Sequence, residues 1–139
     1  MSAMYEQIRG LFMADAFARG LGIEIVDIDE GRAAASLRVS SEMLNGAGVA
    51  NGGVAFALAD YALAIAANTL GQNISLTASM SISFCGAVRT GDTLTAEARA
   101  DAKSSRTAFL NVAVRNQSGA VIALAQDLTS ETSRQKPQF

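Results

Sequence analysis

Hydrophobic and polar residues alternate along several stretches of this chain, most regularly over Ile74–Phe84. Every second residue of that segment is hydrophobic, and Ser or Thr lies between, which is typical of a strand that packs one face on a core. Alternation or β-branched residues predict five more strands, which are Ile23–Ile28, Arg32–Val39, Thr93–Ala102, Thr107–Arg115 and Val121–Ser130. Because short turns join the last four strands of the chain, we expect these to form an antiparallel meander.

Two other stretches have the character of helices. Apolar residues at helical spacing predict an amphipathic helix over residues 2–18, ended by Gly20 and Gly22. The segment over residues 54–70 is apolar on every side apart from one carboxylate, which is typical of a buried helix. We expect Gly71 to end this long helix.

The order of these elements sets the expected architecture: a helix and two strands, then the long helix, then four strands. Helix and sheet segments are segregated along the chain, so the expected fold class is α+β, with the sheet wrapped around the long helix. We expect one domain over residues 1–139, with the first helix in 1–20 and a flexible tail in 131–139.

Composition and charge narrow the functions open to the chain. The 139 residues include 11 basic and 13 acidic ones, with a net charge of −2 and no basic run, which argues against a nucleic-acid partner. The chain contains no His, so Ser-His-Asp catalysis and a His-based zinc site are excluded, and we expect no metal and no cofactor. A single cysteine, Cys85, no signal-peptide pattern and no membrane-spanning run predict a cytoplasmic protein without a membrane partner.

One carboxylate, that of Asp60, lies inside the long apolar helix. A buried carboxylate is uncommon unless it is paired or used in chemistry. Asn51-Gly52-Gly53 precede the helix and can offer backbone N–H groups at its positive end. A carboxylate beside such an anion site suggests chemistry at a carbonyl group, with Asp60 as general base or as nucleophile. The structural alternative is a carboxylate held by a backbone amide or by a Ser of a partner chain.

The same segment also carries a family pattern. It reads Asn45-Gly46, five residues, then Gly52-Gly53-x-x-Phe56-x-Leu58-Ala59-Asp60-x-Ala62-x-x-x-Ala66-x-Asn68. Softer matches are Phe84 at a strand end, the turn Gly91-Asp92-Thr93-Leu94, and Ser104-Ser105-Arg106-Thr107 before a strand. By this pattern, which extends over roughly residues 10–130, the chain resembles the hotdog-fold acyl-CoA thioesterases of the phenylacetic-acid-degradation (PaaI) type.

The resemblance implies a hotdog fold and the hydrolysis of an aromatic or medium-chain acyl-CoA to free acid and CoA. It further implies a homodimer as the minimal unit, paired into a tetramer, in which Gly52 N–H of one chain polarises the thioester carbonyl next to Asp60 of the other. The remaining site residues that it implies are Asn45 and Asn51 near the reacting groups, with Asn45 holding the hydrolytic water. Expected substrate contacts are Gly53, Thr77, Arg89, Ser105, Arg106 and Thr107.

Two positions depart from the family pattern. Asn51 stands where the family has His, and the amide of Asn cannot titrate. The Arg-Pro pair that the family has after Phe84 is replaced by Cys85-Gly86-Ala87-Val88-Arg89. The first departure leaves open a second function, that of a non-catalytic acyl-CoA-binding protein.

Each of these candidates also has a structural explanation. Asn45 before a Gly is typical of a turn, Asn51 is typical of a helix cap, and paired glycines form tight turns. The stripe of Ser and Thr that includes Thr77 is usual on the solvated face of a sheet. Arg89 and residues 105–107 have the composition of solvated turns.

Overall fold

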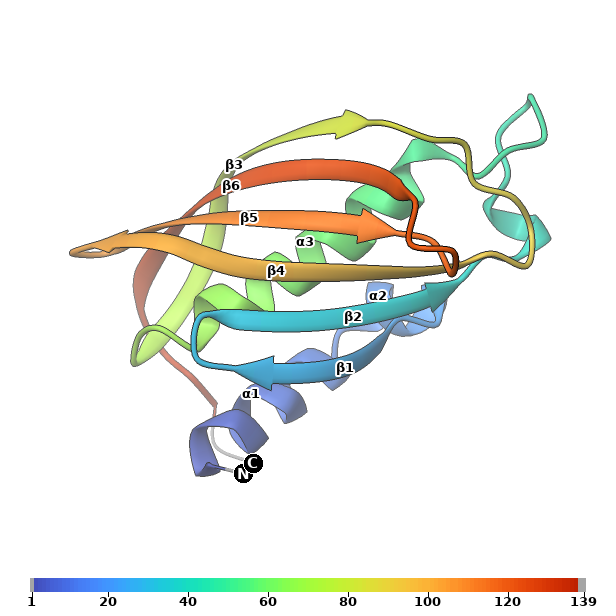
Figure 1. Ribbon diagram of the computed structural model, residues 1–139. Coiled ribbons are helices and arrows are strands. Elements are labelled where there is room, and N and C mark those ends of the chain that lie inside the picture. Colours follow the sequence, from blue (N-terminus) through green and yellow to red (C-terminus); the bar gives the residue numbers. More distant parts are fainter. Residues whose placement is uncertain (1, 138–139) are drawn as a thin grey trace.

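One curved antiparallel sheet wraps around a long helix in the computed structural model, which describes residues 2–137 (Figure 1). The helices are α1 (Ala3–Met13), α2 (Ala16–Leu21) and α3 (Gly52–Asn68), and a 3-10 turn spans Ser41–Met43. The strands are β1 (Glu24–Asp29), β2 (Arg32–Arg38), β3 (Asn73–Phe84), β4 (Thr93–Ser104), β5 (Thr107–Arg115) and β6 (Val121–Gln135). The predicted α+β class and the predicted order of elements are confirmed. No helix in this part of the chain is long and apolar enough to cross a membrane.

The strand order in the sheet is β1-β2-β4-β5-β6-β3, and all neighbours are antiparallel. The predicted four-stranded meander is therefore wrong in part, because β3 pairs with β6 and not with β4. Residues 85–92 carry the chain from the end of β3 across to β4, which lies next to β2. A period of two records which face of a strand is buried, and it contains no information on which strand lies beside it.

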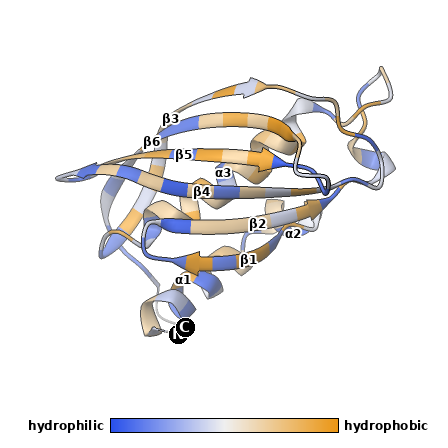
Figure 2. Ribbon diagram, in the orientation of Figure 1, coloured by the Kyte–Doolittle hydropathy of each residue, from blue (hydrophilic) through white to orange (hydrophobic). Residues whose placement is uncertain are grey.

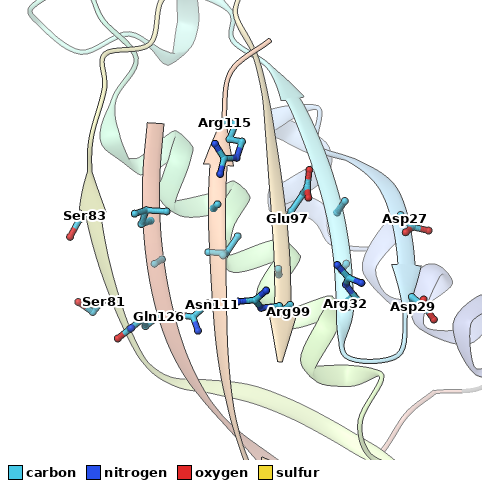
Figure 3. A pocket seen from close by; sticks show the side chains of 17 residues that line it. Asp27, Asp29, Arg32, Ser81, Ser83, Glu97, Arg99, Asn111, Arg115 and Gln126 are labelled. Carbon is cyan, nitrogen blue, oxygen red and sulfur yellow. The ribbon is translucent and has the colours of Figure 1, made fainter. Parts of the chain in front are cut away.

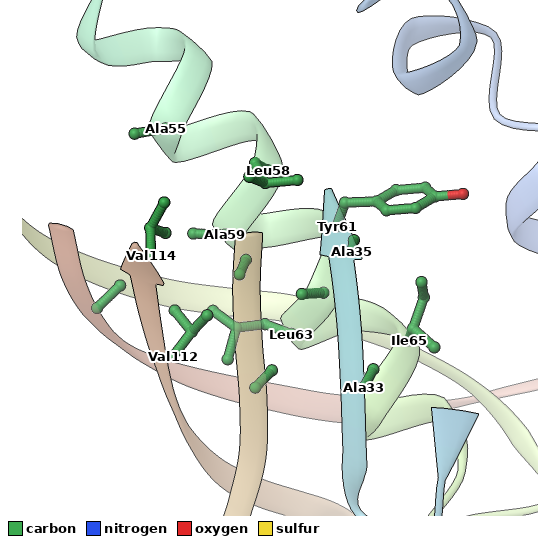
Figure 4. Packing of buried hydrophobic residues seen from close by; sticks show 14 of the residues in the cluster. Ala33, Ala35, Ala55, Leu58, Ala59, Tyr61, Leu63, Ile65, Val112 and Val114 are labelled. Atoms are coloured by element: carbon green, nitrogen blue, oxygen red, sulfur yellow. The ribbon is translucent and has the colours of Figure 1, made fainter. Parts of the chain in front are cut away.

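Helix α3 packs its apolar surface along the inner face of the sheet (Figure 4). Leu58, Leu63 and Ile65 are fully buried there, and they share one core cluster with Ala35 of β2 and Val112 of β5. Figure 2 shows the alternating hydrophobic and hydrophilic bands of the strands that supply this face. Burying one such Leu or Ile side chain contributes about 1.5–3 kcal/mol, so this packing is the main source of stability in the fold.

The first predicted helix is broken into two. Over residues 2–18 the structure has α1 and then α2, because the Asp15 carboxylate accepts a hydrogen bond from Ala18 N–H at 2.9 Å and so caps a new helix. Gly22, with φ of 75°, ends α2 in the left-handed conformation that favours glycine. The sequence pattern predicted the periodicity and missed the competing cap.

The ends of α3 and β6 also differ from the prediction. Helix α3 stops at a Thr69 cap with an ordinary right-handed backbone, so Gly71 does not end it. Gly71 lies against the Glu131 side chain, and a Cβ there would require the Glu131 carboxylate to move. Strand β6 continues along β3 as far as Gln135, so the predicted tail over 131–139 is wrong for its first five residues, and residues 138–139 lie outside the described part.

Asn68 joins the end of α3 to the start of β3. Its side chain, 1 % exposed, donates to Ala64 O at 2.8 Å and to Ser75 O at 3.1 Å, and it accepts from Ser75 N–H at 3.0 Å. Both backbone groups of Ser75 are thereby held. Because side chains two residues apart share a face of a strand, this clamp also fixes where Thr77 lies over the helix.

Candidate active site

Asp60 lies at the edge of the α3 surface that the sheet covers, on the side that faces α1 and α2. It is half-buried, where the all-round apolar sequence of α3 suggested full burial. Its neighbours on that side of the helix, Phe56, Ala57 and Ala64, are exposed or half-buried. Together with α1 and α2, this side encloses a cavity of about 310 Å³, whose aromatic lining is Phe12, Phe17, Phe56 and Tyr61. A single helix face therefore presents a carboxylate to an apolar cavity.

Thr77 and a second carboxylate complete the surroundings of Asp60. The Thr77 hydroxyl lies 3.3 Å from Asp60 Oδ1 and 3.3 Å from Asp127 Oδ2. The family resemblance implied Thr77 at the site, and the structure brings Thr77 to Asp60. Asp127, which is 4 % exposed, was not predicted as a site residue. The sequence of β6 contains one indication of this role. Asp127 lies at an inward-facing position of the alternating pattern, between the inward-facing Ala125 and Thr129.

Both carboxyl groups hold protons more strongly than a solvated aspartate. Burial raises the pKa of Asp60, the Thr77 hydroxyl opposes this shift, and the charge of Asp15 adds to it. Burial raises the pKa of Asp127 to about 6, with Thr77 opposing and the charge of Asp60 adding. A carboxylate of raised proton affinity is a stronger base toward water than an ordinary one.

The N-terminus of α3 presents backbone N–H groups. Asn51 is the N-cap, and its Oδ1 accepts a hydrogen bond from Gly53 N–H at 2.8 Å, so its structural explanation as a cap holds. Gly52 N–H has no acceptor within residues 2–137 and lies at the positive end of the helix. The Phe84 ring packs so closely that a Cβ on Gly52 would lie 3.2 Å from it. Gly52 therefore combines an unused donor with a close aromatic wall.

Asn45 forms a turn in the loop before α3. Its Oδ1 accepts hydrogen bonds from Ala47 N–H at 2.9 Å and from Val49 N–H at 3.3 Å. Within one chain this side chain shapes the loop that leads to Asn51, whose N–H donates to Met43 O at 2.8 Å.

One chain does not bring all the predicted site residues together. Gly52 and Asp60 are two turns apart on the same helix, which separates them by about 12 Å along its axis, too far for both to contact one carbonyl group. Arg89 is exposed in the segment after β3, and its N–H donates to Asp92 Oδ2 at 2.9 Å. The turn that holds Ser105, Arg106 and Thr107 projects at the end of the sheet away from the α3 N-terminus (Figure 1).

A broad hollow of the surface lies elsewhere. It covers about 1020 Å³ over the outer face of the sheet, and its charged lining includes Asp27, Arg32, Glu97, Arg99 and Arg115 (Figure 3). None of the predicted site residues lines it. Asp60 and the broad charged hollow lie on opposite sides of the sheet.

Comparison with known proteins gives consistent matches. The sequence profile of the thioesterase superfamily matches residues 47–123. The acyl-coenzyme A thioesterase PaaI of Escherichia coli K12 is 34 % identical over 120 residues, which is 86 % of this chain and 85 % of that protein. The solved structure of E. coli PaaI, from the phenylacetic acid degradation operon, superposes with a TM-score of 0.91, covering 96 % of each chain at 31 % identity. A hypothetical thioesterase of Streptococcus pneumoniae, solved with coenzyme A, has a TM-score of 0.82 at 25 % identity and covers 91 % of this chain and 98 % of its own.

Proposed function

This chain belongs to the thioesterase superfamily and is a thioester hydrolase of the hotdog fold, and we propose that it hydrolyses an acyl-CoA with Asp60 as the catalytic carboxylate. The observation that carries the proposal is Asp60 itself, a half-buried carboxylate of raised pKa, hydrogen-bonded by Thr77 and open to an aromatic cavity. A CoA carrier is supported by the E. coli relative, named for acyl-CoA hydrolysis, and by the streptococcal structure with bound coenzyme A.

Asp60 supports hydrolysis in either of two ways. As a general base it takes a proton from water, the water oxygen bonds to the thioester carbon, and the C–S bond breaks. The proton then passes from Asp60 to the departing CoA thiolate, which leaves the free acid and CoA. As a nucleophile it forms a mixed anhydride with release of CoA, and water hydrolyses that anhydride in a second step.

Gly52 N–H is the proposed donor to the carbonyl oxygen as negative charge develops there. Because about 12 Å of helix separates it from Asp60 of the same chain, the site needs Gly52 from one chain and Asp60 from a second. A free sheet edge supports such a pairing: β3 is an edge strand of 12 residues with Leu76 and Phe84 exposed. A long apolar edge of this kind is normally covered in a stable protein. We therefore propose a homodimer as the minimal unit, with tetramers formed from two dimers.

The remaining site residues take supporting roles in this proposal. The cavity of about 310 Å³ and its aromatic lining suit an aromatic or medium-chain acyl group. Arg89 and Arg106 supply cations for the CoA phosphates, and Ser105 and Thr107 supply hydroxyl donors beside Arg106. Asn45 holds the hydrolytic water through its amide N–H₂, since its Oδ1 is used in the turn. Asn51 and Gly53 fix the loop that presents Gly52.

The alternative function is the binding of CoA esters without turnover. The reason for considering it is Asn51, which stands where the family has His. Its cap on α3 uses only the amide oxygen and needs no exchangeable proton. Hydrolysis by Asp60 and Gly52 is therefore compatible with Asn at this position.

Thiol release from a panel of aromatic and aliphatic acyl-CoA esters tests the proposal. We expect turnover by the wild-type protein, with a preference for aromatic or medium-length acyl groups, and loss of turnover in Asp60→Asn. Bound CoA ester without turnover in either protein would support the binding function instead. Equal turnover in both proteins would remove Asp60 from the mechanism.

A further inference from the structure

A single hydroxyl lies between two carboxyl groups beside the cavity. Thr77 Oγ1 of β3 is 3.3 Å from Asp60 Oδ1 of α3 and 3.3 Å from Asp127 Oδ2 of β6. Asp127 is 4 % exposed, and its second oxygen, Oδ1, has no hydrogen-bond donor among the described residues. A buried carboxylate oxygen without a donor is destabilising, so Asp127 is a feature that the packing of the fold does not explain.

Thr77, Asp60 and Asp127 depend on each other through the protons that they share. An ionised carboxylate only accepts hydrogen bonds, and a hydroxyl carries one proton to donate. With Asp60 and Asp127 both ionised, the Thr77 proton can serve one of them, and the other carboxylate faces a hydroxyl lone pair. With a proton on Asp127, its O–H donates to Thr77 Oγ1 and Thr77 donates to Asp60 Oδ1, so both contacts become hydrogen bonds.

Among the described residues, no cation compensates the charge of Asp127. Its cross-strand neighbours are Met80 of β3 and Leu110 of β5, which are apolar. From α3 it faces the charge of Asp60, which raises its pKa. The ion pair found within residues 2–137 joins Arg99 to Asp101, on the exposed side of β4. Asp60 and Asp127 therefore share the Thr77 hydroxyl, and the charge of Asp15 also acts on Asp60.

We propose that Asp127 is a positioning residue of the active site, which acts through Thr77 to control how strongly Asp60 holds a proton. The inference rests on the proposed role of Asp60. When Asp127 is ionised, it accepts the hydrogen bond that Thr77 donates, and it adds a negative charge near Asp60. Both effects make Asp60 a stronger base. When Asp127 is protonated, it donates to Thr77, Thr77 donates to Asp60, and Asp60 becomes a weaker base.

Asp127→Asn fixes the second of these states, because the amide Nδ2 donates to Thr77 at every pH and carries no charge. We expect the acid limb of the kcat/KM profile to move to lower pH by about one unit. We also expect the plateau above it to fall roughly three- to tenfold, as the weaker base requires, with KM unchanged. Asp27→Asn, which removes one carboxylate from the exposed side of β1, is the matched control and should leave the profile unchanged.

A second measurement does not depend on turnover or on substrate. The ¹³C resonance of each aspartate carboxyl group is followed against pH in wild type, Asp127→Asn, Thr77→Val and Asp27→Asn. We expect the Asp60 titration midpoint to fall in Asp127→Asn. Both midpoints should rise in Thr77→Val, which removes the hydroxyl donor and nearly keeps the side-chain shape. The Asp27→Asn protein should titrate like wild type at both positions.

Results that leave the Asp60 midpoint and the acid limb unmoved in Asp127→Asn would overturn the inference, and would make Asp127 a structural residue only. A wild-type protein that hydrolyses no acyl-CoA contradicts the proposed function, while the carboxyl titration still decides whether Asp127 is coupled to Asp60. If Asp127→Asn does not fold, Thr77→Val is used instead. Unchanged titration midpoints of Asp60 and Asp127 in Thr77→Val would also overturn the inference, because they would show that Thr77 does not link the two carboxyl groups.

Discussion

The two chemically distinctive regions of α3 differ in what each one lacks. At its N-terminus the Asn51 cap leaves Gly52 N–H exposed and without an acceptor among the described residues, so this end has a donor and no acid or base. Two turns later, Asp60 is half-buried beside Thr77 and Asp127, so this region has acids and no backbone donor. Neither region alone can attack a thioester and also stabilise the developing oxyanion. This difference is the reason why we propose a site assembled from two chains.

Among the substitutions in these two regions of α3, one at Asp60 should have the largest effect on activity. Asp60→Asn keeps the size of the side chain and removes its basicity, and we expect kcat to fall by about 10³. Thiol release at saturating acyl-CoA gives kcat, and urea unfolding checks that the free energy of unfolding has not fallen. A variant with more than about a tenth of wild-type kcat would contradict a catalytic role for Asp60.

The donor at the other end of α3 can be removed without removing the helix. Gly52 is the first residue of α3, where proline is well tolerated, and Asn51 before it is already extended, with ψ of 137°. Gly52→Pro removes the N–H, and we expect kcat to fall by about 10². Gly52→Ala adds the same Cβ against Phe84 and keeps the N–H, so it is the matched control and should retain most of the activity. Equal losses in the two variants would indicate steric damage alone.

The pair of acids near mid-helix should make stability depend on pH. Between the pKa of an unfolded aspartate, about 3.9, and the folded value of about 6, native Asp127 keeps a proton that the unfolded chain has released. The contribution of Asp127 to the free energy of unfolding therefore falls as pH rises through this window, by about 1.4 kcal/mol for each unit of pKa difference, and is constant above it. Urea unfolding at pH 4.5 and 7.5 should show a smaller loss of stability in Asp127→Asn than in wild type. Parallel pH dependence of the two proteins would contradict a raised Asp127 pKa.

The smallest expected effect concerns the cap at the α3 N-terminus. Asn51→Ala removes the acceptor for Gly53 N–H, and we expect a loss of about 1 kcal/mol in the free energy of unfolding. Asn51→Ser restores a capping oxygen and should recover that stability and keep kcat within about twofold of wild type. A large loss of kcat in a stable Asn51→Ser protein would instead assign Asn51 a direct part in the reaction.

The sequence predicted the bounds of the helices and strands better than it predicted which strands lie side by side. The period of two in β3 and the all-round apolar character of α3 are local properties, so both elements were predicted within a few residues of their observed bounds. The pairing of β3 with β6 depends on how residues 85–92 cross the sheet, and no local pattern records that path. The break before α2 depends on Asp15, whose cap competes with a continuous helix pattern.

Family spacing and residue chemistry together led to two of the three residues that meet at Asp60, and neither of them pointed to the third. Asp60 and Thr77 were both expected, and the structure places them in hydrogen-bond contact. Asp127 lies in a strand 50 residues from Thr77 and belongs to no motif, so only its inward position in β6 distinguished it. Polar residues at inward positions of an alternating strand are therefore worth testing as site residues before a structure is known.

Mixed dimers show whether Gly52 and Asp60 act together from different chains. Asp60→Asn and Gly52→Pro chains carrying different tags are co-expressed, and oligomers containing both are purified through both tags. One of the two sites in each mixed dimer then has both Gly52 N–H and the Asp60 carboxylate, so we predict that turnover returns to about half that of wild type. Mixed dimers as inactive as their parents would contradict the account and would place the whole site within one chain.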